Sequence, residues 1–299
     1  MPMFLCRHVP IAIWIFTLVL FSSACAPVKY ARVEAVARTV QDVATAAAKQ
    51  SDLSIIHEGT PAYLMLLDGL IEAYPENKDL LLAGSQAYSS YASSFFSDDE
   101  HYKSEALYRK AKLYGFRALS GRADFSKAVS GSLDEFTALL NQFNKQDVPG
   151  LFWTANAWAG WIGAKMGAVD AMADLPMLEA TMKRILELDD TFYYGGPHLL
   201  MGVYLAAKPA IIGGDPAKAK QHFDRAFALG SGKILMSRVL FAQYYARGIR
   251  DRALFTTTLE DVLAARADEF PELTFVNTVA REKARQLLEK TEAYFANSQ

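Results

Sequence analysis

One stretch of the sequence, from Leu186 to Gly230, constrains the fold most, because helix starts and stops lie close together in it. Pro197 stands where a proline opens a helix, since the N–H that proline lacks is not needed in the first turn. Asp215-Pro216 supplies an N-cap followed by a first-turn proline, and Gly230 stands where a helix ends. The stretch therefore predicts two consecutive helices joined by the glycine-containing connection 208–214.

The second of these helices carries a stripe of small and aromatic residues, Ala219, Phe223 and Ala226, spaced four and three positions apart. Gly202 lies on the helix before it. Together they resemble a tetratricopeptide (TPR) unit, in which two helices approach over small residues and a phenylalanine fills the angle between them. The alternative is an ordinary helical hairpin with the same residues in its core, so repetition along the chain distinguishes the two.

Further helices are predicted along the chain from apolar residues at helical spacing. They cover approximately 63–74, 80–91, 107–119, 136–143, 151–166, 178–188, 234–245, 254–263 and 281–294. No alternating stretch demands a sheet. The repeat is degenerate, because Leu178 and Ala219 are 41 positions apart (219 minus 178), against about 34 in an uninterrupted TPR unit. We predict an all-α fold of TPR-like hairpins, with an irregular helical bundle as the alternative.

The N-terminus has the pattern of an export signal. Its apolar run, Ile11 to Phe21, is shorter than the roughly 20 residues of a spanning helix, which favours a signal peptide over residues 1–24. Ser22-Ser23-Ala24 leads into Cys25 and resembles a lipobox, although Ser22 replaces the usual leucine. We expect a lipid on Cys25, a first helix or tether over 25–50, and a helical domain over 51–299. Ala26 is not the aspartate that retains many lipoproteins in the inner membrane, which favours the outer membrane.

The cysteine content and the net charge limit the kinds of site and partner that the chain can have. The only cysteines are Cys6, in the signal, and Cys25, so the mature fold would have no thiol for a disulfide, a thiolate metal site or cysteine catalysis. The formal net charge is −2 and the isoelectric point about 6.2. This balance gives no indication of nucleic-acid binding and no polybasic surface for membranes.

Motifs for enzyme chemistry are missing or broken. No histidine has the spacing of a metal ligand, and no Gly-x-Ser-x-Gly elbow exists. Residues 230–233 look like the tail of a phosphate loop, but Phe227 and Ile234 stand at two of its required positions. His57-Glu58 is followed by Gly-Thr-Pro, which we expect to break a helix. The acidic pairs 98–99 and 189–190 are explained by capping and solvation. We predict neither an enzyme nor a cofactor.

The aromatic residues between 152 and 194 are dense enough to line a pocket, with helix-pair core as the alternative. We expect Trp158, Trp161, Tyr194 and His198 near the wall of an apolar cavity that accepts an elongated, mostly apolar solute. His198 would orient a carboxylate head, or simply make a capping contact. Phe223, by contrast, is predicted to be a structural wedge between paired helices.

The chain resembles one family, the T-component of TRAP (tripartite ATP-independent periplasmic) transporters. The resemblance rests on the lipobox-like cysteine, Tyr194-Gly195-Gly196-Pro197-His198, Gly213-Gly214-Asp215-Pro216 and Tyr244-Tyr245-Ala246-Arg247. It covers most of residues 50–265. It implies TPR-like hairpins in a superhelical array around an apolar cavity or pore, partnership with an extracytoplasmic solute-binding protein, and apolar or amphipathic ligands.

Three hypotheses follow from these patterns. The first is a ligand-binding and docking accessory of a periplasmic transport system. The second is a TPR scaffold for envelope assembly that binds a partner protein and no small molecule. The third, an enzyme, lacks a motif. The sequence leaves homo-oligomerisation open and does not identify the solute.

Overall fold

The computed structural model describes residues 35–96, 101–121, 124–165 and 167–296. Throughout these ranges the regular secondary structure is helical and no β-strand occurs, which confirms the all-α prediction. The chain divides into two compact units, residues 1–43 and 44–299. Of the first unit only residues 35–43 are described, and they are helical. The predicted signal peptide and Cys25 lie outside the described residues.

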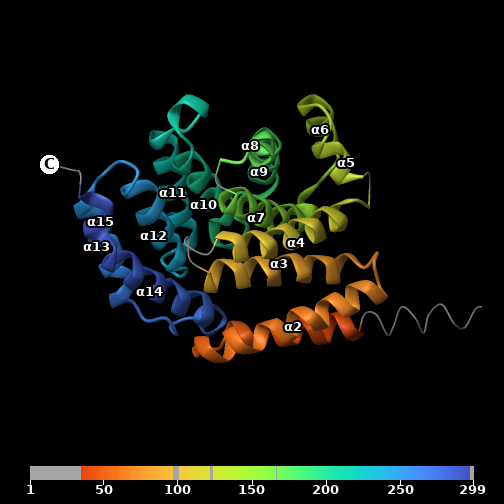
Figure 1. Ribbon diagram of the computed structural model, residues 1–299, viewed down its shortest axis with the longest axis horizontal. Coiled ribbons are helices and arrows are strands. Elements are labelled where there is room, and N and C mark those ends of the chain that lie inside the picture. Colours follow the sequence, from red (N-terminus) through yellow and green to blue (C-terminus); the bar gives the residue numbers. More distant parts are fainter. Residues whose placement is uncertain (1–34, 97–100, 122–123, 166, 297–299) are drawn as a thin grey trace, which may run out of the picture. The chain divides into compact units, whose positions relative to one another are not determined.

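The second unit consists of short and medium-length helices (Figure 1). They are α2 (Leu53–Ala73), α3 (Lys78–Phe95), α4 (His101–Leu119), α5 (Phe125–Val129), α6 (Leu133–Leu140), η2 (Lys145–Asp147), α7 (Val148–Ala164), α8 (Val169–Ala173), α9 (Leu175–Asp189), α10 (Phe192–Ala207), η3 (Ala210–Ile212), α11 (Pro216–Gly230), α12 (Met236–Leu240), the π-helical η4 (Phe241–Ala246), α13 (Arg252–Ala264), η5 (Pro271–Leu273), α14 (Thr274–Glu289) and α15 (Thr291–Phe295). Among the described helices, none has the length and apolar content needed to span a bilayer.

Helices α2, α3, α4 and α7 form successive layers, each packed against the next (Figure 1). The chain reverses between α2 and α3 at Pro75 and Asn77. The Asn77 side chain accepts a hydrogen bond from the Leu80 N–H at 2.9 Å and so caps α3. Pro75 and Asn77 thus lie between the helices predicted over 63–74 and 80–91. Stacked hairpins of this kind are compatible with a TPR-like superhelix.

A single carboxylate, Asp68 on α2, joins the first three layers. It accepts hydrogen bonds from the hydroxyls of Tyr88 and Tyr114, each at 2.7 Å, and from Lys110. Burial acts to raise the pKa of Asp68, but the hydrogen bonds from Lys110 and the two tyrosines outweigh it and hold that pKa below its ordinary value. Asp68 therefore stays ionised and fixes the register of α2 against α3 and α4.

The expectation that Gly-Thr-Pro breaks a helix after His57-Glu58 is wrong, because α2 continues through Pro61. Pro61 cannot donate a hydrogen bond to the carbonyl of His57, four residues earlier. The hydroxyl of Tyr91, on α3, donates to that carbonyl instead, at 3.4 Å. A tertiary partner thus replaces the backbone bond that proline removes.

The α10–α11 hairpin forms as predicted from its sequence. Asp215 caps α11 by accepting the Lys218 N–H at 3.0 Å. Phe223 has no exposed surface, and a Cβ added at Gly202 would stand 3.2 Å from its ring. The two helices therefore approach closely at Gly202, with Phe223 filling the space. The prediction that Phe223 is a structural wedge is confirmed.

The entry to α10 has an unusual backbone. Tyr193, Tyr194 and Gly195 are all left-handed, with φ of 45°, 59° and 81°, so the chain kinks before the regular helix continues at Pro197. A Cβ on Gly195 would lie 2.9 Å from Leu229 on α11. The kink thus brings this turn close to the end of α11, a strained arrangement that only firm packing maintains.

Two extended hydrophobic clusters lie among the buried residues that the structure describes. The larger one joins α4, α5, α6, α7, α9 and α10 around Trp158, and it includes Phe136, Leu140 and Phe143. The smaller one joins α12, η4, α13, α14 and α15 around Phe255.

Candidate functional site

Trp158, predicted to line a cavity, lies inside the larger cluster with no exposed surface. Its ring makes edge contacts with Phe116 and Phe136, at centroid distances of 4.9 and 6.5 Å. Its indole N–H donates to the Asp174 carboxylate at 2.7 Å. The ring and the polar N–H of this tryptophan therefore both serve the packing of α7 against its neighbours.

Trp161, one turn further along α7, is 7% exposed and donates its N–H to Glu105 at 3.1 Å. The Lys112 ammonium lies 3.5 Å from the centre of its ring and 2.8 Å from Asp174. Burial lowers the pKa of Lys112, while the Asp174 carboxylate acts against that shift. The two tryptophans are thus joined through Lys112 and Asp174.

His198 lies between α10 and α11. Its Nδ1 is 2.9 Å from Nδ1 of His222, and its Nε2 is 3.4 Å from the carboxylate of Asp190, which also pairs with Arg225 at 3.2 Å. Burial lowers the pKa of both histidines. Neutral rings suit the Nδ1–Nδ1 hydrogen bond, in which one nitrogen donates and the other accepts. His198 therefore makes more than a capping contact.

Tyr194 belongs to the left-handed turn before α10. Its ring lies 5.9 Å from that of Tyr193, and the Lys233 ammonium stands 5.8 Å from its centre. The structure thus brings Trp158 and Trp161 together, whereas Tyr194 and His198 each have partners of their own. The proposed role of these four residues in ligand binding stays a prediction.

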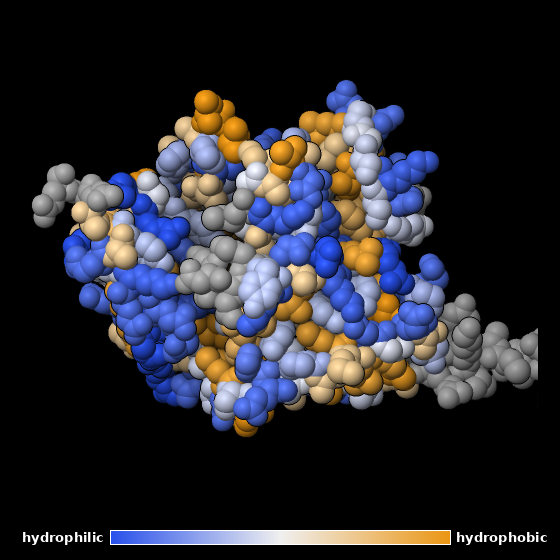
Figure 2. Space-filling model, viewed as in Figure 1, coloured by the Kyte–Doolittle hydropathy of each residue, from blue (hydrophilic) through white to orange (hydrophobic). Residues whose placement is uncertain are grey.

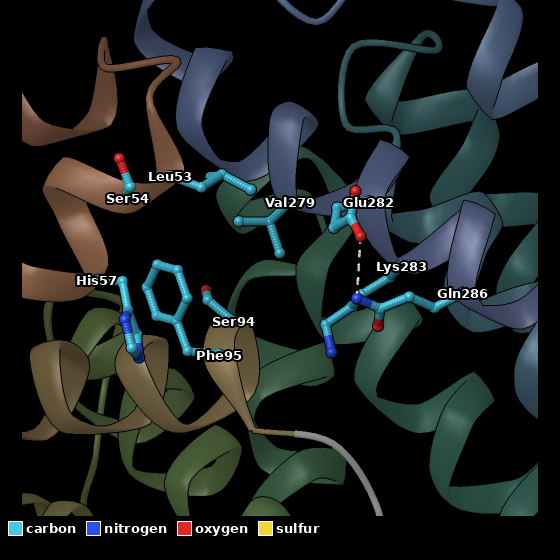
Figure 3. A pocket seen from close by; sticks show the side chains of 9 residues that line it. All are labelled: Leu53, Ser54, His57, Ser94, Phe95, Val279, Glu282, Lys283 and Gln286. Atoms are coloured by element: carbon cyan, nitrogen blue, oxygen red, sulfur yellow. Dashed lines mark hydrogen bonds between the residues drawn. The ribbon is translucent and has the colours of Figure 1, made fainter.

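Open space lies elsewhere, at the junction of α2, α3 and α14 (Figure 3). A pocket of about 280 Å³ is bounded by side chains from these three helices. They are Leu53, Ser54 and His57 from α2, Ser94 and Phe95 from α3, and Val279, Glu282, Lys283 and Gln286 from α14. The ring of Phe95 lies 4.9 Å from that of His57, so one wall is aromatic.

A second pocket, of about 690 Å³, adjoins the first, since Leu53 and Glu282 line both. Its remaining lining residues are Lys49, Ser51, Ala267, Asp268, Pro271, Thr274, Thr278, Arg281 and Arg285. We call the two pockets together the α14 groove. It runs from an aromatic and aliphatic end at Phe95 to a polar end at Arg281.

The polar end of the α14 groove contains three cationic and two anionic side chains: Lys49, Arg281, Arg285, Asp268 and Glu282. Glu282 pairs with Arg285 and accepts a hydrogen bond from Gln286 at 3.0 Å. The buried Nε of Arg281 has no hydrogen-bond partner among the described residues. A buried donor left in this way is costly to stability, and because it is closed to solvent it is not itself a contact point for a ligand in the open groove.

Sequence reasoning missed the α14 groove because its walls come from residues more than 180 positions apart, such as Phe95 and Val279. The available signal was the charged face of the last long helix, with Arg281, Glu282, Lys283 and Arg285 in close succession. Among the residues that the structure describes, no three His, Cys, Asp or Glu side chains converge as a metal site.

Comparison with known protein families gives a match over most of the chain. Residues 49–295 match the family model described as the TRAP transporter T-component, which covers most of the chain and all of the α14 groove. No curated protein matches the chain. The match places the protein with the TRAP transport machinery.

Proposed function

Because the chain belongs to the TRAP transporter T-component family, we propose that it is a periplasm-facing lipoprotein that assists a TRAP-type solute uptake system. Cys25 would carry the lipid after removal of residues 1–24 and would hold the helical domain, residues 51–299, at the outer membrane. The support is the apolar run from Ile11 to Phe21, followed by small residues before Cys25.

Fractionation of a Cys25→Ser variant tests the anchor. The variant should leave the membrane fraction and lose cleavage before position 25. A variant that stays in the membrane and is processed at the same bond would contradict the lipoprotein proposal.

We further propose that the α14 groove binds an amphipathic carboxylate. The observation that supports this is the polarity of its lining, with Phe95 and Val279 at one end and the cationic side chains of Lys49, Arg281 and Arg285 at the other. Apolar burial would supply most of the affinity, at about 25 cal/mol per Å² of buried area. The charged end would set the orientation of the ligand.

Trp158, Trp161, Tyr194 and His198 are a second proposed location for the same ligand. Binding there would require Trp158 to leave its contacts with Phe116 and Phe136. The α14 groove needs no such rearrangement, because its space is already open.

Calorimetric titration with decanoate, followed in parallel by tryptophan fluorescence, separates the two locations. No tryptophan lines the α14 groove, so binding there should release heat with little change in emission. Arg281→Gln and Ser94→Leu should each weaken binding about tenfold or more, while Lys127→Gln, on α5, should not. A large emission change that persists in both groove variants would favour the tryptophan site. If neither decanoate nor fatty acids of other chain lengths release heat, only the scaffold hypothesis remains.

We also propose that an extracytoplasmic solute-binding protein docks on this chain. The outer face of α2 is suited to it, because Ile55, Met65 and Leu66 are 56%, 75% and 54% exposed. Ile55 and Leu66 lie about three turns apart and share one face of the helix. Copurification of the cognate solute-binding protein should fall at least about tenfold in Leu66→Asp, since an interface core disfavours charge. Unchanged copurification would contradict this docking face.

A further inference from the structure

His198 on α10 and His222 on α11 form a hydrogen-bonded pair whose geometry limits how many protons it can hold. Their Nδ1 atoms are 2.9 Å apart, so one nitrogen donates and the other accepts. Nε2 of His198 lies 3.4 Å from the carboxylate of Asp190, which is an acceptor. One arrangement of two neutral rings satisfies both contacts: Nε2 of His198 donates to Asp190, and Nδ1 of His222 donates to Nδ1 of His198.

The histidine pair can accept one proton without breaking its hydrogen bond, but not two. The first proton fits on Nε2 of His222, whose lone pair these two contacts leave unused. A second proton can enter only at Nδ1 of His198, where one donor would then face another. Both rings would also be positively charged, and like charges this close repel each other. Double protonation therefore breaks the contact between the two rings.

The charges around the pair offer His198 a second partner. Burial lowers the pKa of His198, the Asp190 carboxylate directly after α9 acts against that shift, and the Arg225 guanidinium adds to it. Burial also lowers the pKa of His222, and His198 adds to that shift. Both rings are therefore neutral at neutral pH, and in acid a charged His198 can exchange His222 for Asp190.

The other elements packed against α10 and α11 were compared for titratable groups that could act on the pair. Helix α7 presents the ring of Phe152 to the start of α10, and η4 presents Tyr245 to Phe223. Tyrosine ionises at about pH 10, well above histidine. The remaining charged side chains of α9, α11 and α12 have ion-pair partners of their own: Glu179 with Lys183, Arg184 with Glu187, Asp189 with Lys145, Lys218 with Asp215, Lys220 with Asp224, and Arg238 with Asp261. The histidines and Asp190 are therefore the groups that respond to acid at this contact.

The histidine pair lies toward the open end of the α10–α11 hairpin, whose helices run side by side (Figure 1). The connection 208–214 joins the helices at the other end, where Figure 2 shows hydrophobic residues. At the open end, the left-handed turn 193–195 packs on α11, since a Cβ on Gly195 would stand 2.9 Å from Leu229. Such strained backbone persists only where its packing holds it. His198 is about one helical turn beyond Gly195, so loss of its contact with α11 weakens that packing.

We propose that His198 and His222 form a two-proton acid switch that separates the start of α10 from the end of α11. In the neutral state the pair holds the left-handed turn 193–195 against α11. In the doubly charged state His198 turns to Asp190, and the turn is released. The switch depends neither on ligand binding nor on the lipid anchor, because its contacts lie within one hairpin and the residue directly after α9.

Nitrogen NMR of the full chain with isotope-labelled histidine reports which ring nitrogens carry a proton. At pH about 7.5 we expect His222 protonated on Nδ1 and His198 on Nε2, with the signals assigned by His222→Gln and His198→Gln. In acid the two rings should take up protons in steps separated by more than about one pH unit, because the first charge opposes the second. His57→Gln, on α2, is the matched control and should leave both signals unchanged. Independent titration of both rings at the ordinary value of about 6.5 would overturn the proposal.

Hydrogen exchange followed by mass spectrometry tests the opening itself. After correction for the intrinsic pH dependence of exchange, the opening constant of residues 190–200 should rise between pH about 7.5 and about 5. The rise should be at least about tenfold larger in the wild-type protein than in His222→Gln, where one histidine remains and no second charge opposes it. The NMR titration of the wild-type protein stays decisive even if this variant is unstable.

Three further results would overturn the acid switch. The first is an equal rise in the wild-type protein and in His222→Gln. The second is the same rise in α3, since acid would then unfold the whole domain and not one hairpin. The third is a change of the His198 and His222 signals on addition of EDTA at neutral pH, which would mean that a bound metal ion, and not a proton, joins the two nitrogens.

Discussion

The core around Trp158 and the α14 groove differ in how their side chains fill space. In the core, aromatic rings meet one another and small residues on α7, and the indole N–H finds Asp174. Along α14, Glu282 and Arg285 extend toward solvent, and pockets of about 280 and 690 Å³ lie beside them. Dense aromatic residues therefore indicate close packing here, and open space occurs where helices distant in sequence meet over long charged side chains.

Of the substitutions that compare these two regions, Trp158→Ala should destabilise the protein most. We expect the free energy of unfolding to fall by about 4–5 kcal/mol, because the change leaves a cavity and removes a hydrogen bond to Asp174, which would keep its ion pair with Lys112. Urea denaturation measures it. Phe95→Ala, at the rim of the open pocket, should lower the free energy of unfolding by less than half as much. Equal losses in the two variants would mean that the two regions do not differ in packing.

Phe223→Ala extends the comparison to the α10–α11 hairpin. The wedge has no exposed surface and contacts Gly202, so its removal should cost about 3 kcal/mol. The variant should show a lower Tm and a lower midpoint in urea. An unchanged Tm would mean that the hairpin is held by other contacts than this ring.

Lowering the pH should weaken the charged links of the packed region. Burial acts to raise the pKa of Glu179, but hydrogen bonds from Lys183, Tyr204 and Lys208 outweigh it and lower that pKa from 4.5 to about 2. A carboxyl whose folded-state pKa is depressed contributes stability above its unfolded pKa, and this is lost as pH falls through the folded value. Between pH about 4.5 and about 2 we expect the chain to lose on the order of 2 kcal/mol from this group.

Chemical denaturation at a series of pH values, compared with Glu179→Gln, measures the effect of Glu179. The variant should be less stable at pH 7 and show a shallower decline below pH about 4.5. Parallel curves for the two proteins would mean that Glu179 contributes no pH dependence.

Ser94→Leu, which places an aliphatic side chain into the open pocket, should have the smallest effect on stability. We expect a change within about 0.5 kcal/mol, because the new side chain enters existing space without displacing packed neighbours. Urea denaturation of this variant supplies the measurement. A loss comparable to that of Trp158→Ala would mean that the α14 groove is already filled.

The sequence predicted those parts of the site that depend on local signals. It located Trp158 and Trp161 on one helix and His198 in the first turns of another, and the structure agrees. It did not reveal that Asp174, Lys112 and Phe116 would enclose the tryptophans, or that His222 would meet His198. Those partners come from other helices, and helical periodicity carries no information about which helices become neighbours.

By itself the sequence determined the helical class, the cap at Asp215 and the Gly202–Phe223 contact, because each depends on residues of one helix or of two consecutive helices. Tertiary structure decided the passage of α2 through Pro61, the closure around Trp158 and the opening of the α14 groove. The physical reason is the same in all three cases. A lost hydrogen bond, a buried ring and an unfilled space are each settled by atoms that distant segments bring, or do not bring, to the same place.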